Sequence, residues 1–391
     1  MPIRSVVRIA GLCCAALLPL AAHAAESPGC VSAQPWAEWD GFKREFISED
    51  GRIIDKTADE RSISEGQSYA LFFALVDNDR ETFDRVLHWT NDNLAKGKLG
   101  ERLPAWLWGK HEDGSWRVLD DNPAADADLW IAYSLLEAGR LWQDEAYTRL
   151  GRSMLKLIRD TEFASIASVG PLLLPGPFGF VQPDGSVRIN PSYYPEFQLR
   201  YLESVDPRGD WLEAWKSLVR LAPRIFPRGV APDNVMIARD GSVRPDPEKG
   251  VTGSYDAIRV YLWAGMSPKT PESILPYLEG WGELIHDAGT PPESVDTASV
   301  DYEADYSPLG FSAASLPYLR AIGSNKRFGE QRERVRRNSL RGILGINPLS
   351  HPQYYDQVLS MFGMGFVNGL YSFEADGRLR PRWTQVCDTP E

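Results

Sequence analysis

The chain has little cysteine, little histidine and no excess of positive charge. Its 391 residues include four Cys and five His, and 42 Lys and Arg stand against 54 Asp and Glu, for a formal net charge of −12. Nucleic acids are bound through clustered Lys and Arg, so this balance argues against nucleic acid as the main partner. A disordered chain is also excluded, because 43% of the residues are hydrophobic and 25% are charged.

Several catalytic patterns are absent as well. The sequence has no Gly-x-Ser-x-Gly nucleophile elbow and no Gly-rich phosphate loop followed by Lys-Ser or Lys-Thr. The four His beyond the N-terminal segment are scattered and fit no zinc-binding spacing: His88, His111, His286 and His351. No pattern therefore indicates a metal or an organic cofactor.

Only one long apolar run occurs, and it lies at the N-terminus. Ile9–Leu20 follows Arg4 and Arg8 and precedes Ala22-His23-Ala24. This order is typical of a secretory signal, and the run is too short to span a bilayer comfortably. We expect residues 1–24 to be removed, which gives a periplasmic or extracellular protein without a membrane segment. An uncleaved membrane anchor is the alternative.

Cleavage would leave 391 − 24 = 367 residues with a net charge of 40 − 54 = −14. It would also remove Cys13 and Cys14, so that Cys30 and Cys387 remain near the two ends. In an oxidising compartment these two predict one disulfide, and two free thiols are the alternative. No Ser/Gly/Pro-rich linker divides residues 25–391, which are expected to form a single domain.

The periodicity of apolar residues is helical in most of the chain, as in Phe83, Val86 and Leu87. It predicts twelve helices near residues 35–47, 64–76, 81–95, 126–140, 144–159, 191–205, 210–224, 255–266, 271–287, 311–322, 325–339 and 354–366. Strand signals are short and lie around four Asp-Gly turns, at 113–114, 184–185, 240–241 and 376–377. The expected fold is mainly α, with β-hairpins on loops.

Acidic residues stand at three predicted helix starts. Ser62-x-x-Glu65 fits a capping box, so the pattern alone favours Glu65 as a helix cap. Asp126 and Asp128 open an apolar helix and point to different faces. Asp256 precedes Arg259 by three residues, and an Asp paired in this way stays ionised, as a general base requires. Paired carboxylates suggest glycoside hydrolysis, which composition and spacing do not prove.

The segment around Asp126 resembles the signature of glycoside hydrolase family 8. The pattern runs Ala-Ser/Thr-Asp-Ala/Gly-Asp and ends at positions occupied here by Ala138 and Trp142, with Ala125 in place of the expected Ser or Thr. Four further segments are similar to family motifs: Ser64–Tyr69, Glu101–Lys110, Asn190–Tyr193 and Ser254–Arg259. The resemblance covers about Cys30 to Cys387 and includes family members encoded with bacterial cellulose synthase.

The resemblance implies an (α/α)6 barrel and an inverting endo-β-1,4-glucanase that acts on cellulose-type glucan. Glu65 matches the general acid, Asp256 the general base, and Asp126 an acid that holds the distorted sugar. A periplasmic role in cellulose synthesis and export, with the synthase complex as a possible partner, is also implied. The remaining matches are to substrate-binding positions: Tyr193, Arg259, Trp106, Trp108, Tyr354 and Tyr355. Asp356 stands where the family pattern has Asn.

Three alternatives remain open at this point. A polysaccharide lyase on an (α/α) toroid shares the fold, but its uronate substrate needs cationic groups that a chain of charge −14 supplies poorly. A family 8 hydrolase specific for xylan or chitosan differs only in its subsite contacts. A glucan-binding protein without activity would keep the aromatic residues and could lose the acids, and all three acids are present.

Overall fold

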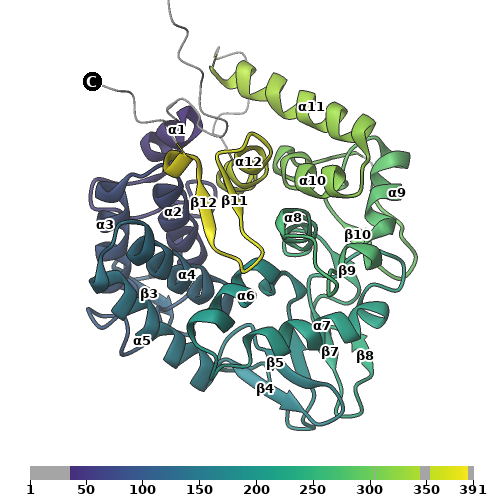
Figure 1. Ribbon diagram of the computed structural model, residues 1–391, viewed down its shortest axis with the longest axis horizontal. Coiled ribbons are helices and arrows are strands. Elements are labelled where there is room, and N and C mark those ends of the chain that lie inside the picture. The colour runs from purple at the N-terminus through teal and green to yellow at the C-terminus, as the bar shows by residue number, and fades with distance from the viewer. Residues whose placement is uncertain (1–35, 304, 344–352, 386–391) are drawn as a thin grey trace, which may run out of the picture.

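Twelve α-helices dominate the part of the chain that the structure describes, and they form two concentric rings (Figure 1). The computed structural model describes residues 36–303, 305–343 and 353–385. Helices alternate along the chain between the outer and the inner ring, and α1 packs against α12 to close the ring. The predicted mainly α fold, an (α/α)6 barrel, is confirmed.

The two rings differ in how their helices are buried. In α2, 12 of 13 residues are buried, whereas in the outer helix α5 only 5 of 17 are. A helix that is apolar on every side belongs inside a bundle, and an amphipathic one covers it. The inner helices are α2 Ser64–Val76, α4 Ala125–Leu141, α6 Glu196–Val205, α8 Ile258–Met266, α10 Leu309–Ala321 and α12 Tyr354–Val367. The outer helices are α1 Ala37–Phe46, α3 Arg80–Trp89, α5 Glu145–Thr161, α7 Trp211–Ile225, α9 Glu279–Ala288 and α11 Asn325–Ile343.

Aromatic side chains fill the centre of the inner ring. The ring of Trp130 on α4 lies 4.9 Å from that of Phe72 on α2 and 5.2 Å from that of Phe362 on α12, centre to centre. Trp263 on α8 lies 5.3 Å from the same indole. Large planar side chains bury much area each, so this cluster both stabilises the barrel and closes it beneath the helix N-termini.

The predicted helix boundaries are correct to within a few residues except where proline intervenes. The helix predicted near 191–205 begins as α6 only at Glu196, after Pro195, and the one near 271–287 begins as α9 at Glu279. Short 3-10 turns, Pro191–Tyr193 and Leu275–Tyr277, precede them. Proline lacks a backbone N–H and disfavours helical geometry in the residue before it, which explains both late starts.

Short antiparallel strands lie on the loops, and all four Asp-Gly turns join antiparallel segments as predicted. At Asp113-Gly114 the Asp carboxylate accepts the N–H of Ser115 at 2.9 Å, and Gly114 has a φ of 83°, which glycine adopts freely. The hairpin of β4 and β5 has no Asp-Gly turn and was not predicted. The strands are β1 Ser62–Ile63, β2 Leu107–Lys110, β3 Trp116–Asp120, β4 Phe163–Ile166, β5 Gly170–Leu173, β6 Val187–Ile189, β7 Val235–Ile237, β8 Val243–Pro245, β9 Thr252–Gly253, β10 Val295–Asp296, β11 Tyr371–Phe373 and β12 Leu379–Pro381.

Three sequence predictions lie outside the described residues: the signal segment 1–24, Cys30 and Cys387. Among the helices that are described, none combines the length and the hydropathy needed to cross a membrane.

Candidate active site

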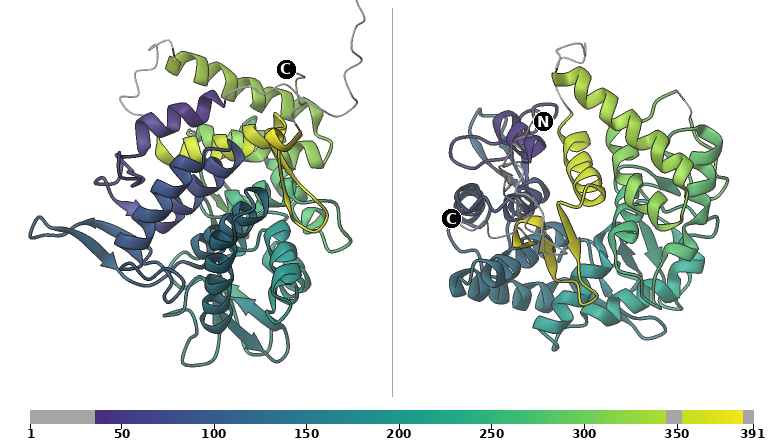
Figure 2. Two further views of the ribbon diagram at one scale, coloured as in Figure 1. Left: turned by 60° about the vertical axis from the view of Figure 1, so that its left-hand side comes forward. Right: turned by 45° about the horizontal axis from the view of Figure 1, so that its top comes forward.

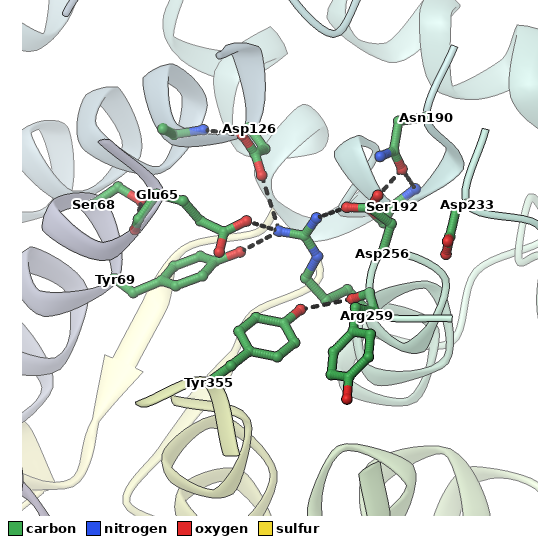
Figure 3. Close-up of polar contacts among 12 residues, drawn as sticks. Glu65, Ser68, Tyr69, Asp126, Asn190, Ser192, Asp233, Asp256, Arg259 and Tyr355 are labelled. Carbon is green, nitrogen blue, oxygen red and sulfur yellow. Dashed lines mark hydrogen bonds and ion pairs between the residues drawn. The ribbon is translucent and has the colours of Figure 1, made fainter. Parts of the chain in front are cut away.

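One buried guanidinium joins the three acidic positions that the sequence singles out (Figure 3). Arg259 is 2% exposed, and its Nη1 contacts Glu65 Oε2 and lies 2.9 Å from Asp126 Oδ2. Its Nη2 lies 2.7 Å from Asp256 Oδ1. Glu65 and Asp256 therefore lie on opposite sides of the guanidinium, each at a different terminal nitrogen.

The barrel brings these residues together because they stand at one end of three inner helices. Glu65 is the second residue of α2, Asp126 the second of α4, and Asp256 lies two residues before α8. Residues 65 and 259 are 194 positions apart in the sequence. Only closure of the ring places them in contact.

The capping-box interpretation of Glu65 was wrong. Among the described residues, no side chain caps the start of α2. Ser62 Oγ donates to the carbonyl of Ile53, and Gln67 accepts the N–H of Ile53 at 2.6 Å. The N–H of Ser64 instead donates to the carbonyl of Trp106 at 3.0 Å, so the neighbouring loop supplies the partner. The Glu65 carboxyl is thereby left for the site.

Glu65 has the protonation state of an acid. Burial raises the pKa of Glu65 to about 8, Arg259 opposes the shift, and the negative charge of Asp126 adds to it. The carboxyl is therefore protonated at neutral pH. One oxygen accepts from Arg259, and a hydrogen bond between the Glu65 and Asp126 carboxyls also favours the protonated form of Glu65.

Asp256 is the most accessible of the three acids, with 34% of its side chain exposed. Asp233, which sequence reasoning missed, organises its turn: Asp233 Oδ1 accepts the N–H groups of Ser254 at 2.8 Å and Ala257 at 2.9 Å. Asp233 lies in a loop 23 residues before Asp256, and no local pattern marks it. Burial, followed by the charge of Asp256, raises the pKa of Asp233 to about 6.

Two tyrosines line the guanidinium. Tyr193 was predicted, and its ring centre lies 5.6 Å from Arg259 Cζ. Asn190 fixes the turn of Tyr193 by accepting the N–H of Ser192 at 2.9 Å. Tyr69, the last residue of the Ser64–Tyr69 motif, contacts Arg259 Nη1 through its hydroxyl at 2.9 Å.

Of the two neighbouring tyrosines that were predicted to bind substrate, Tyr355 lies at the site and Tyr354 is buried in the core. Tyr355 reaches the site, and its hydroxyl donates to the carbonyl of Tyr255 at 2.8 Å. Tyr354 is 3% exposed and packs on Phe42 and Phe46, so its burial argues against direct contact with a sugar.

The two tryptophans that were predicted to bind substrate, Trp106 and Trp108, also differ in position. Trp106 is half-buried, and its backbone bonds Ser64 next to Glu65. The ring of Trp108, on β2, packs against the rings of Trp89 on α3 and Trp116 on β3. Trp106 is therefore the one whose backbone borders the acid, and contact of either ring with substrate stays a prediction.

A second carboxyl pair lies behind Asp126. Asp128 and Glu162 are fully buried, and no other described residue bonds any of their four oxygens. The two carboxyls face one another, so a proton on one can bond the other. Burial raises the pKa of Glu162 to about 8, and burial with the charge of Glu162 raises that of Asp128 well above its usual range.

Glu162→Gln is expected to stabilise the protein at alkaline pH. The folded state keeps a proton on this pair between about pH 4.5 and about pH 8, where the unfolded chain has lost it, so stability falls as pH rises through this window. A Gln amide donates permanently to Asp128 and removes one ionisation. We expect a gain of about 1–3 kcal/mol in the free energy of unfolding at pH 8, measured by urea titration. Exposed Asp160→Asn is the control, and an equal pH dependence of wild type and Glu162→Gln would contradict the shared proton.

Comparisons with known proteins agree with this architecture. The model of the family described as "Glycosyl hydrolases family 8" matches residues 12–369. An "Endoglucanase" of Xanthomonas axonopodis pv. citri (strain 306) is 45% identical over 379 residues, 95% of each chain. An "Endoglucanase" of Escherichia coli (strain K12) is 41% identical over 91% of this chain and 94% of its own. The crystal structure of an endo-1,4-D-glucanase from Vibrio fischeri ES114 superposes with a TM-score of 0.83 at 40% identity, covering 89% of this chain and 99% of that one.

Proposed function

The chain belongs to glycosyl hydrolase family 8 and is an endoglucanase, and from this premise we propose that it hydrolyses internal β-1,4 bonds of cellulose-type glucan with inversion at the anomeric carbon. One observation carries the proposal: a single buried guanidinium contacts Glu65 through one terminal nitrogen and the more accessible Asp256 through the other. The pair supplies an acid on one side of the reacting bond and a base on the other.

Glu65 acts as the general acid in this proposal. Its proton passes to the glycosidic oxygen while the bond from that oxygen to the anomeric carbon breaks. The support is its raised pKa, which keeps the proton in place at neutral pH until the leaving oxygen becomes basic. The departing sugar then carries a hydroxyl group.

Asp256 acts as the general base. It takes a proton from a water molecule that attacks the anomeric carbon from the face opposite the leaving group, which inverts the configuration. An inverting pair needs about 6.5–9.5 Å between its carboxyls to admit that water, whereas a retaining pair is closer. The intervening guanidinium holds the two carboxyls apart, and the exposure of Asp256 gives water access to it.

Asp126, Arg259 and Tyr193 position the reacting groups. Asp126 binds Arg259 through one oxygen, and its charge helps to keep Glu65 protonated. Arg259, in the first turn of α8, orients Asp256, which lies just before that helix. Tyr193, whose ring centre lies 5.6 Å from Arg259 Cζ, lies near both Asp126 and Asp256 and is placed to bind the attacking water.

The expected result is release of reducing ends from carboxymethyl-cellulose, in the presence of EDTA, with the α-anomer formed first. Proton NMR of the products of short cello-oligosaccharides reads the anomer before mutarotation. Initial β-anomer would refute inversion. Activity on xylan or chitosan without activity on β-glucan would refute the substrate.

We further propose that the protein acts in the periplasm beside the cellulose synthesis and export machinery. The N-terminal segment and the similarity to family members encoded with cellulose synthase support this. The proposal includes removal of residues 1–24 and a disulfide between Cys30 and Cys387. Osmotic-shock fractionation with mass spectrometry of the released protein tests it: a cytoplasmic chain that keeps its N-terminal segment would overturn it.

A further inference from the structure

The β2–β3 hairpin carries a tryptophan pair outside the catalytic centre. The rings of Trp108 and Trp116 stack with centres 5.1 Å apart and planes at 19°. Arg52 Cζ lies 4.3 Å from the Trp108 ring centre and 4.6 Å from that of Trp116. Trp89 packs edge-on against Trp108 at 5.4 Å. Trp108 is thus fixed by several neighbours, whereas Trp116 is 38% exposed.

The orientation of Trp116 is held by groups that are themselves anchored. Arg52 Nε donates to Ser62 Oγ at 2.8 Å, and Ser62 is buried and bonds the carbonyl of Ile53. The exposed part of the Trp116 indole is apolar area that a bound molecule could remove from water, which is favourable. A ring held in place before binding loses little entropy when a ligand covers it.

The hairpin continues the wall that carries the proposed acid. In the register of β1 and β2, Ser62 pairs with Trp108, and Glu65 follows Ser62 by three residues. Three residues span at most about 11 Å, so the hairpin begins close to the catalytic centre. Trp116 pairs with Lys110, farther out along the same face, and the hairpin projects from the body at the left of the left-hand view in Figure 2.

We propose that Trp116, held by Trp108 and Arg52, is an outer binding platform for polymeric β-glucan that contacts sugar units remote from the bond being cut. The identity of the polymer rests on the proposed function. A β-linked glucose ring presents C–H groups on both faces, and these pack against the electron-rich face of an indole. Only chains long enough to reach from Glu65 to the hairpin gain from this contact.

Leu119 provides a matched control on the same strand. It is 40% exposed, against 38% for Trp116, and it lies beside Gly109 on the opposite face of the hairpin. Trp116→Ala, Trp116→Phe and Leu119→Ala are each placed in a Glu65→Gln chain, and affinity for hydroxyethyl-cellulose is measured by affinity electrophoresis, without turnover.

We expect Trp116→Ala to bind the polymer about tenfold more weakly, because the variant lacks the indole face on which a sugar ring packs. Trp116→Phe should keep most of the affinity, and Leu119→Ala all of it. In chains with Glu65 intact, Trp116→Ala should lower the ratio of activity on polymer to activity on cellotetraose by about the same factor.

Two results would overturn the platform. The first is a polymer affinity in the Trp116→Ala and Leu119→Ala chains that is unchanged from that of the parent Glu65→Gln chain. The second is an equal loss in both with a lower melting temperature, which would assign Trp116 to the stability of the hairpin. If wild type hydrolyses no β-glucan, the proposed function fails, and the binding comparison still decides on the platform because it needs no turnover.

Discussion

Glu65→Gln is expected to lower kcat on soluble β-glucan by about 10²–10⁴-fold with the fold intact, because the amide cannot protonate the leaving oxygen. At neutral pH the native carboxyl is itself uncharged, so Gln reproduces its size and its acceptance of a hydrogen bond from Arg259. Initial rates of reducing-end release, with thermal melting to check the fold, measure the effect. Exposed Glu101→Gln is the control, and near-normal kcat in Glu65→Gln would remove this residue from the role of acid.

The same residue predicts how activity depends on pH. The acid form is the active one, and the pKa of Glu65 is raised to about 8, so kcat/KM should fall as pH rises through about 8. The residual rate of Glu65→Gln should not show this alkaline decline. A wild-type kcat/KM that already declines as pH rises through about 5 would contradict the buried, protonated state of Glu65.

Asp256→Asn is expected to lower kcat by about 10²–10⁴-fold through loss of the base that activates water. The Asn amide keeps the size of the side chain, and its oxygen still accepts from Arg259 Nη2, as Asp256 does at 2.7 Å. The same rate assay on soluble glucan measures the loss. Asp287→Asn, an exposed residue on the outer helix α9, should be unchanged.

Azide tests whether Asp256 acts on the face opposite the leaving group. In Asp256→Ala, azide can attack the anomeric carbon directly while the glycosidic bond breaks and Glu65 protonates the departing oxygen. If Asp256 is a base, the new carbon–nitrogen bond forms on the face opposite the leaving group and the product is the α-glycosyl azide. A retaining nucleophile at this position would give the same α-glycosyl azide, so the first anomer of the hydrolysis product distinguishes the two mechanisms, and a β-glycosyl azide would contradict action of Asp256 on the face opposite the leaving group.

The sequence by itself determined the helical architecture. Apolar spacing predicts helices because side chains three and four positions apart share a face, and this local rule placed α2 and α4 to within one residue. The Asp-Gly turns were predicted for an equally local reason: a short carboxylate and a residue free to adopt positive φ. At Pro195 two local signals compete, because apolar spacing predicts a helix from residue 191 and proline disfavours helical geometry in the residue before it. The prediction followed the spacing, and α6 begins later, at Glu196.

The tertiary structure alone decided the chemistry of the site. A local pattern made Glu65 a helix cap, and only the closed ring turned its carboxyl toward Arg259 and Asp126 and buried it. A pKa depends on desolvation and on charges within a few ångströms, and these come from residues far away in the sequence. Three further features also arise from contacts between residues far apart in the sequence. They are the contribution of Asp233, the Asp128–Glu162 pair and the different positions of Trp106 and Trp108. Local spacing shows which residues are near one another on one helix, and packing between helices sets the distances on which acid–base chemistry depends.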